Sequence, residues 1–174
     1  FWSHLSWIGA DSLGIVSIIS ACVGVILALQ SAMQLEKVGA VSYVANLVGF
    51  SIVTELGPLL VCLILSGRAG AAFTAEIATM RISEEIDALE VMGISPIRFL
   101  VWPKFAAMCV MAPLLTLWGD FVGITAGGVF SSLALGLSGR GYFEQTANFL
   151  TVRDLFSGLV KSAGFGITIT LVSC

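Results

Sequence analysis

Two carboxylates lie inside long apolar stretches of this 174-residue sequence, where an acidic side chain needs an explanation. Glu55 comes about 14 residues into such a stretch, which places it roughly 20 Å along a helix. An ionised carboxylate at that depth in a bilayer costs at least ~2.5–3.5 kcal/mol, so it faces water, a partner group or a polar ligand. Asp120 also lies inside an apolar stretch, and the same argument about the cost of a buried charge applies to it more weakly. These residue types indicate proton transfer, or recognition of a polar group, inside a membrane.

Both carboxylates also have a purely structural interpretation. Glu55 would then cap the backbone beside Pro58 or pair with an arginine such as Arg68. A pairing with a basic residue explains Asp120 equally well. The sequence leaves both interpretations open.

Motifs of enzymes and metal sites are absent from the sequence. There is no Walker A loop, no HExxH, no GxSxG and no GxGxxG followed by an acid. The four cysteines are far apart and His4 is the only histidine, so no metal-ligand spacing occurs. The sequence has no run of basic residues of the kind that binds nucleic acid. We therefore expect a chain without catalytic residues, metal or cofactor, whose energy source is an ion gradient or a partner protein.

The composition is that of an integral membrane protein. Hydrophobic residues make up 57% of the sequence and charged residues 11%, and the mean hydropathy is +1.02. An average soluble domain has about 25% charged residues. Roughly a third of a soluble chain of this size stays exposed to water, which this composition does not permit. The same composition excludes intrinsic disorder.

Gaps between charged residues predict an all-α bundle with four membrane-spanning segments at least partly present. The first, at 12–35, is uncharged and gives about 36 Å of helix, enough to cross a bilayer. The other three are predicted at 41–80, 97–137 and 155–174. We expect the second to be one long helix bent near Pro58, and the third to begin with a short segment before Pro113. A polar loop is expected over 138–153.

Small residues at four-residue spacing predict close packing of these helices, because small side chains let backbones approach in lipid. One row lies in the first span and another in the last: Ser20, Gly24, Ala28 and Ala32, and then Gly158, Ser162, Gly166 and Thr170.

A short amphipathic helix is predicted at 82–92, outside the hydrocarbon. Its apolar positions recur at helical spacing and acids fill most of the others: Ile82, Ile86 and Leu89 against Glu84, Glu85, Asp87 and Glu90. Half of the basic residues lie between Arg68 and Lys104, so the positive-inside rule places this helix in the cytoplasm. Pattern alone is compatible with a solvated loop helix or with a helix that docks on a cytoplasmic partner.

Four motifs in this part of the chain closely resemble the MlaE/Mce-type permease family. They read TELGPLL at 54–60, SGRAG at 66–70, AEIATM at 75–80 and EEIDALEVMGISP at 84–96. The resemblance extends from about residue 13 to residue 174. Three positions depart from the family pattern: Thr54 and Lys104 stand where Arg occurs in relatives, and Ala78 stands where Gly is usual.

The resemblance implies the membrane subunit of an ABC transporter that moves phospholipids or related lipids. In this family, two copies of the subunit form a homodimer that has no catalytic role. It works with cytoplasmic ATPase subunits, which bind ATP and Mg, and with an Mce-domain lipid-binding protein on the far side. Five spans and a preceding interfacial helix are implied for the full protein, so residues 1–174 would be a single transmembrane domain truncated at both ends. The implied location is the bacterial inner membrane, with the chloroplast inner envelope as the alternative.

The resemblance also implies roles for particular residues. The region around Glu55 and the first span matches the part that lines the family's lipid pocket at the dimer interface: Leu29, Gln30, Met33, Gln34, Thr54, Glu55 and Leu56. The segment 84–90 matches the coupling helix that docks on the ATPase: Glu84, Glu85, Ile86, Asp87, Leu89 and Glu90. Because Thr54 replaces the arginine of some relatives, this chain lacks one possible partner for a lipid phosphate at that position.

Two other functions remain possible on the residues alone. One is an ion-coupled secondary transporter that uses Glu55 or Asp120, although no inverted repeat typical of such transporters is visible. The other is a membrane scaffold that uses the acidic helix only to recruit a protein.

Overall fold

The computed structural model describes residues 2–37, 43–93, 95–134 and 139–173. Within them the regular elements are all helices, and four stretches are long and apolar enough to cross a membrane: Ser12–Glu36, Val44–Ile82, Ile97–Ala134 and Val152–Ser173. The predicted all-α polytopic bundle is confirmed. Residues 41–42, 135–137 and 174, which the predicted spans include, lie outside the described residues.

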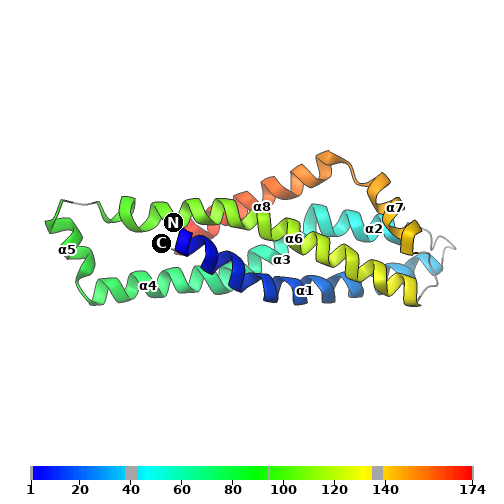
Figure 1. Ribbon diagram of the computed structural model, residues 1–174, viewed down its shortest axis with the longest axis horizontal. Helices are drawn as coiled ribbons and strands as arrows, with labels where there is room; N and C mark the ends of the chain where they lie inside the picture. Colours follow the sequence, from blue (N-terminus) through cyan, green and yellow to red (C-terminus); the bar gives the residue numbers. More distant parts are fainter. Residues whose placement is uncertain (1, 38–42, 94, 135–138, 174) are drawn as a thin grey trace.

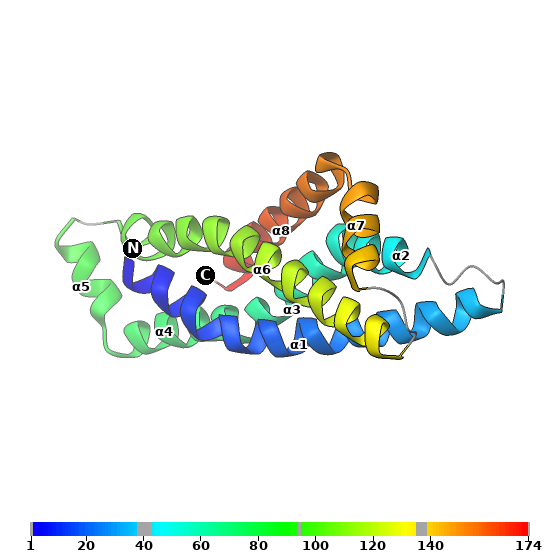
Figure 2. The same ribbon diagram turned by 45° about the vertical axis from the view of Figure 1, so that its right-hand side comes forward.

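The helices α1 (Trp2–Glu36) and α6 (Trp102–Ala134) pack against each other along much of their length (Figure 2). Their backbones approach closely, and a Cβ added at Gly24 would overlap the carbonyl oxygen of Gly123. The predicted row of small residues lies in this interface, since all four of its residues in α1 are buried. Small residues thus allow the close helix contact that drives association in lipid.

The segment Val44–Ile82 is continuously helical but contains two π turns. Its parts are α2 (Val44–Ser51), η2 (Ile52–Leu56), α3 (Gly57–Leu65), η3 (Ser66–Gly70) and α4 (Ala71–Ile82). In the first π turn the Gly57 N–H donates to the carbonyl of Ile52, five residues back. Pro58 follows directly and has no N–H of its own, so the widened turn lies where the α-helical ladder is interrupted.

The third span differs from its prediction, because it has no separate segment before Pro113. A π turn, η4 (Ile97–Val101), leads without interruption into α6, and Pro113 lies inside this helix. Membrane helices tolerate an internal proline because neighbouring helices and local adjustments satisfy the freed backbone groups.

A helix, α7 (Gly139–Phe149), replaces most of the polar loop expected over 138–153. Tyr142 and Thr146 lie one turn apart and are both buried, while Arg140 and Glu144 pair on the exposed side at 3.4 Å. The Thr146 hydroxyl donates to the Tyr142 carbonyl at 2.9 Å, and burial raises the pKa of Tyr142 to about 12. The segment is therefore an amphipathic helix whose buried face is formed by these two residues. After it, α8 (Val152–Ser173) returns through the bundle.

The acidic helix α5 (Glu85–Val91) is shorter than predicted, because α4 continues to Ile82 and a turn separates the two helices. Glu84 takes a left-handed conformation in this turn, with φ of 58°. Ile82 is 85% exposed and does not belong to the apolar face formed by Ile86 and Leu89. In Figure 1, α5 projects beyond the rest of the bundle at one end of the long axis, and α7 lies at the other end.

Candidate functional site

Glu55 in the second span forms an ion pair with Lys161 of α8. The Lys161 ammonium lies 2.6 Å from Glu55 Oε1 and also donates to the Thr54 carbonyl at 2.9 Å. The side chains of Glu55 and Lys161 are 69% and 40% exposed in the single chain. Lys161, from α8, is therefore the basic partner of Glu55, and the pairing with Arg68 considered from the sequence is wrong.

The proline at position 58 explains why the backbone needs Lys161. In an α-helix the Thr54 carbonyl would accept from the N–H of residue 58, and Pro58 has none. An unpaired carbonyl inside a membrane costs several kcal/mol. Lys161 supplies the missing donor. It thus completes the π turn η2 and neutralises Glu55 with one ammonium group.

A glycine one turn earlier in α8 brings Lys161 within reach. A Cβ added at Gly158 would overlap the carbonyl oxygen of Val53, so α8 lies directly against the π turn. All four members of the predicted small-residue row in α8 are buried, in agreement with this contact. The signal for Lys161 was present in the sequence, since the depth argument used for Glu55 applies equally to the basic residue of the last span.

Asp120 lies on the other side of Gly57, and its side chain is only 5% exposed. A Cβ added at Gly57 would overlap the carboxylate oxygen Oδ1 of Asp120, so the acid packs directly on this glycine. Oδ1 has no hydrogen-bond partner within the described part of the chain. The structure shows no basic partner for Asp120 among these residues, which contradicts the simple pairing considered from the sequence.

The residues proposed for a lipid pocket from the first span lie on the outer surface of α1. Leu29, Gln30, Met33 and Gln34 are all exposed in the single chain. Thr54 differs from these residues, because its side chain is buried. Its hydroxyl donates to the Phe50 carbonyl at 2.7 Å and not to Glu55 or Lys161. Leu56 is partly buried. In this site Thr54 contributes its backbone carbonyl rather than its side chain.

A second ion pair fixes the end of the bundle nearest α5. The Lys104 ammonium is 2.8 Å from Glu76 Oε2, and it lies 5.2 Å from the centre of the Phe73 ring. Lys104 is 1% exposed, whereas Glu76 is about half exposed. The pair connects α4 to α6, so it fixes the base of the long helix on which Glu55 also lies.

Replacing Glu76 with Gln is expected to destabilise the protein by about 2 kcal/mol, because it leaves the buried Lys104 ammonium without a counter-charge. Fully buried pairs broken in this way lose ~3–5 kcal/mol, and the exposure of Glu76 reduces that loss. The double variant Glu76→Gln/Lys104→Met should recover most of the stability. Thermal unfolding in lipid nanodiscs measures both, and equal loss in the single and double variants would contradict the pairing.

The acidic residues proposed for partner binding are on the surface. Glu84, Glu85, Asp87 and Glu90 are all exposed, and Asp87 forms a surface ion pair with Arg81 at 3.1 Å. Ile86 and Leu89 are half-buried and line a hollow together with Met80, Met92 and Phe99. Within the described residues no group of three or more His, Cys, Asp or Glu could hold a metal ion.

Comparison with known proteins identifies the family. The permease MlaE family matches residues 1–174. A probable ABC transporter permease protein of Rickettsia felis is 39% identical over 98% of this chain and 66% of its own length. A probable ABC transporter permease protein of Synechocystis is 34% identical, again over 98% of this chain and 65% of its own length. The chloroplastic protein TRIGALACTOSYLDIACYLGLYCEROL 1 of Arabidopsis thaliana is 31% identical over 95% of this chain and 47% of its own length.

This chain thus spans about two thirds of the length of the bacterial relatives. The match covers every element described above, from α1 through the Glu55–Lys161 pair to α8. The chain belongs to the MlaE permease family.

Proposed function

We propose that two copies of this chain form the membrane pathway of an ABC transporter that moves phospholipids or related lipids. ATP is hydrolysed in a separate cytoplasmic subunit, which holds the ATP and Mg, and this chain has no catalytic role. Family membership and the names of the bacterial relatives support the permease role. The name of the Arabidopsis relative, which mentions a galactosyl diacylglycerol, supports a glycerolipid substrate.

One structural observation carries this proposal: a continuous helical segment joins the polar site to the acidic helix. Glu55 and the end of α4 at Ile82 belong to the same uninterrupted stretch Val44–Ile82, about 40 Å apart at 1.5 Å per residue. The Glu76–Lys104 pair braces this stretch near its base. A movement imposed on α5 by a partner would therefore act directly on the Glu55–Lys161 pair.

The charges at the site suit a lipid headgroup. Lys161 supplies a cation next to the position where Thr54 replaces the arginine of some relatives, so a phosphate has a partner here despite that substitution. The apolar Leu29 and Met33 and the polar Gln30 and Gln34 are exposed on α1, as residues that line a pathway between two subunits would be. A dimer would shield these surfaces and leave room for acyl chains between them.

The exposed acids of α5 suit a basic groove on a cytoplasmic ATPase. On the opposite side, beyond α7, an Mce-domain protein would receive or deliver the lipid. We assign the complex to the bacterial inner membrane. The chloroplast inner envelope is the alternative, since the Arabidopsis relative is chloroplastic.

Reversing two acids of α5 is expected to reduce co-purification of the ATPase subunit at least tenfold. We choose Glu85→Lys with Glu90→Lys, because Asp87 already pairs with Arg81 within the chain. The full-length protein is expressed with its genomic neighbours and isolated in mild detergent. Glu144→Lys, an exposed acid on α7 at the other end of the bundle, is the matched control and should keep the ATPase bound.

Loss of the ATPase from both variants, or from neither, would contradict the assignment of α5 as the docking helix. If no ATPase accompanies the unmodified protein either, an ion-coupled carrier becomes the better hypothesis. Asp120 would then be the first residue to test, because it is a buried acid in the middle of a span. Activity that depends on a proton gradient and is lost in Asp120→Asn would support that alternative.

A further inference from the structure

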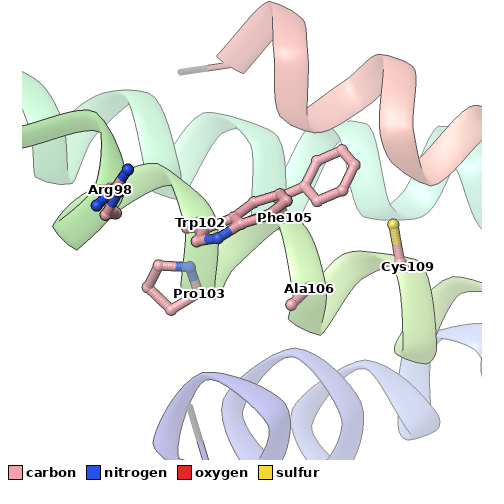
Figure 3. Close-up of a pocket in the computed structure, with 6 residues that line it drawn as sticks. All are labelled: Arg98, Trp102, Pro103, Phe105, Ala106 and Cys109. Carbon is pink, nitrogen blue, oxygen red and sulfur yellow. The ribbon is translucent and has the colours of Figure 1, made fainter.

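A groove lies on the outer surface of α6 near the end of the bundle that carries α5 (Figure 3). It encloses about 390 Å³ and is lined by Arg98, Trp102, Pro103, Phe105, Ala106 and Cys109. Apart from Arg98 its walls are apolar. Figure 3 shows these side chains along η4 and the first turns of α6, with α1 and α8 passing on either side. None of them takes part in the site around Glu55.

Arg98 is an unpaired cation at the rim of this groove. The side chain is exposed, and no hydrogen bond or ion pair is formed by it among the described residues. Lys104 and Lys161 have carboxylate partners. Arg98 also forms a wall of an adjoining hollow of about 410 Å³, which it shares with Trp102. The guanidinium is therefore accessible from two sides.

With α5 in the cytoplasm, as the distribution of basic residues predicts, the groove lies where η4 and α6 enter the membrane from that side. The apolar stretch Ile97–Ala134 begins one residue before Arg98 and continues through Trp102 to Cys109, so Arg98 lies at the outer end of the groove. Trp102 is 63% exposed. Tryptophan favours this interfacial depth.

We propose that this groove binds an anionic phospholipid of the cytoplasmic leaflet. The lipid phosphate lies on the Arg98 guanidinium, which can donate two parallel hydrogen bonds to it. One acyl chain follows Trp102, Phe105 and Cys109 toward the bilayer interior. Basic pockets between membrane helices on the cytoplasmic side recognise anionic headgroups in this way. The apolar walls of the groove favour a lipid over a soluble phosphate, because a soluble phosphate would contact only Arg98 and leave these walls unused.

This lipid is distinct from the proposed cargo and would be retained by a protein that transports nothing. The groove is separated from Glu55 along the chain by α3, α4 and α5, and it faces outward from α6. Its occupancy adds contacts at the point where α6 leaves the membrane and continues toward α5. The proposal therefore stands or fails independently of the transport function.

Quenching of tryptophan fluorescence by brominated lipids tests the proposal. Two versions of the full-length protein keep a single tryptophan, either Trp102 or Trp118, with every other tryptophan replaced by Phe. Trp118 lies 16 residues further along α6, is 45% exposed and donates to Ser17, so it reports general contact with lipid. Each protein is placed in nanodiscs containing phosphatidylglycerol or phosphatidylcholine with the same brominated acyl chains.

We expect half-maximal quenching of Trp102 at a mole fraction of phosphatidylglycerol about fivefold lower than that of phosphatidylcholine, since one arginine near the membrane surface contributes about 1 kcal/mol. Trp118 should not distinguish the two lipids. Arg98→Gln should abolish the preference at Trp102, whereas Arg153→Gln, an exposed arginine at the start of α8, should leave it unchanged.

Three results would overturn the proposal. Equal quenching of Trp102 by both lipids would show that the groove does not recognise the headgroup. Absence of quenching by either lipid would show that protein covers the groove. Loss of the preference on addition of inorganic phosphate at constant ionic strength would show that Arg98 binds an anion and not a lipid.

Discussion

Replacing Lys161 with Met is expected to abolish lipid transport by the full-length protein and to destabilise it by about 2 kcal/mol. The change leaves Glu55 without a counter-charge and the Thr54 carbonyl without a donor. An unpaired carboxylate deep in a bilayer costs ~2.5–3.5 kcal/mol or more, and an orphaned carbonyl adds ~1–3 kcal/mol. The expected loss is smaller than the sum because both side chains are partly exposed. Thermal unfolding in nanodiscs and transfer of labelled phospholipid measure the two effects.

Two further variants separate the role in lipid binding from the role in folding. Lys161→Met with Glu55→Gln removes both charges, so it should recover most of the stability while transport stays lost. Lys161→Arg keeps a cation for both oxygen partners and should keep measurable transport. Full transport by Lys161→Met would show that the ion pair is not the headgroup site. Failure of the double variant to recover stability would indicate that the Thr54 carbonyl, and not Glu55, is the group that most needs Lys161.

Replacing Gly24 with Ala is expected to destabilise the bundle by about 3 kcal/mol, at the upper end of the range for overpacked cores. The added methyl group would overlap the Gly123 carbonyl oxygen, and a backbone atom in a helix cannot rotate away as a side chain can. The helices α1 and α6 must therefore move apart along their whole interface. Unfolding in nanodiscs, or the yield of folded protein in mild detergent, reports the loss.

Gly14→Ala is the matched control in the same helix, because a Cβ at position 14 meets no atom within 4 Å. It should change stability by less than about 0.5 kcal/mol, as surface substitutions usually do. Similar losses in the two variants would mean that helix propensity or expression, and not the contact with Gly123, determines the result.

The sequence was most informative where membrane burial makes a residue type expensive. Depth alone selected Glu55, and the spacing of small residues selected the faces of α1 and α8 that are buried. The same reasoning did not find the partner of Glu55, because Lys161 lies 106 residues away and its approach depends on how α8 packs. Nothing local to position 55 indicates which later helix will contact it.

Local patterns failed in two other places for identifiable reasons. The loop expected over 138–153 contains α7, whose buried face consists of Tyr142 and the polar Thr146 and therefore gives no apolar pattern in the sequence. Ile82 matched the spacing of the amphipathic helix, yet the left-handed Glu84 interrupts that helix and assigns Ile82 to α4. A break made by one non-glycine residue in the left-handed conformation gives no clear signal in the sequence.

The π turns have a consequence for the direction in which α5 points. Each of them holds about one residue more in its turn than an α-helix does, so the residues that follow are rotated by about 100° relative to an unbroken α-helix of the same sequence. The turn at Ser66–Gly70 lies between Glu55 and α5, so it sets the angle between the charged pair inside the membrane and the acidic helix outside it. An ordinary α-helical turn with the same residues at 66–70 would preserve every motif and all four spans, yet α5 would face a different direction around the helix axis. The backbone conformation at 66–70 therefore affects the direction of α5 as much as the identity of the residues there does.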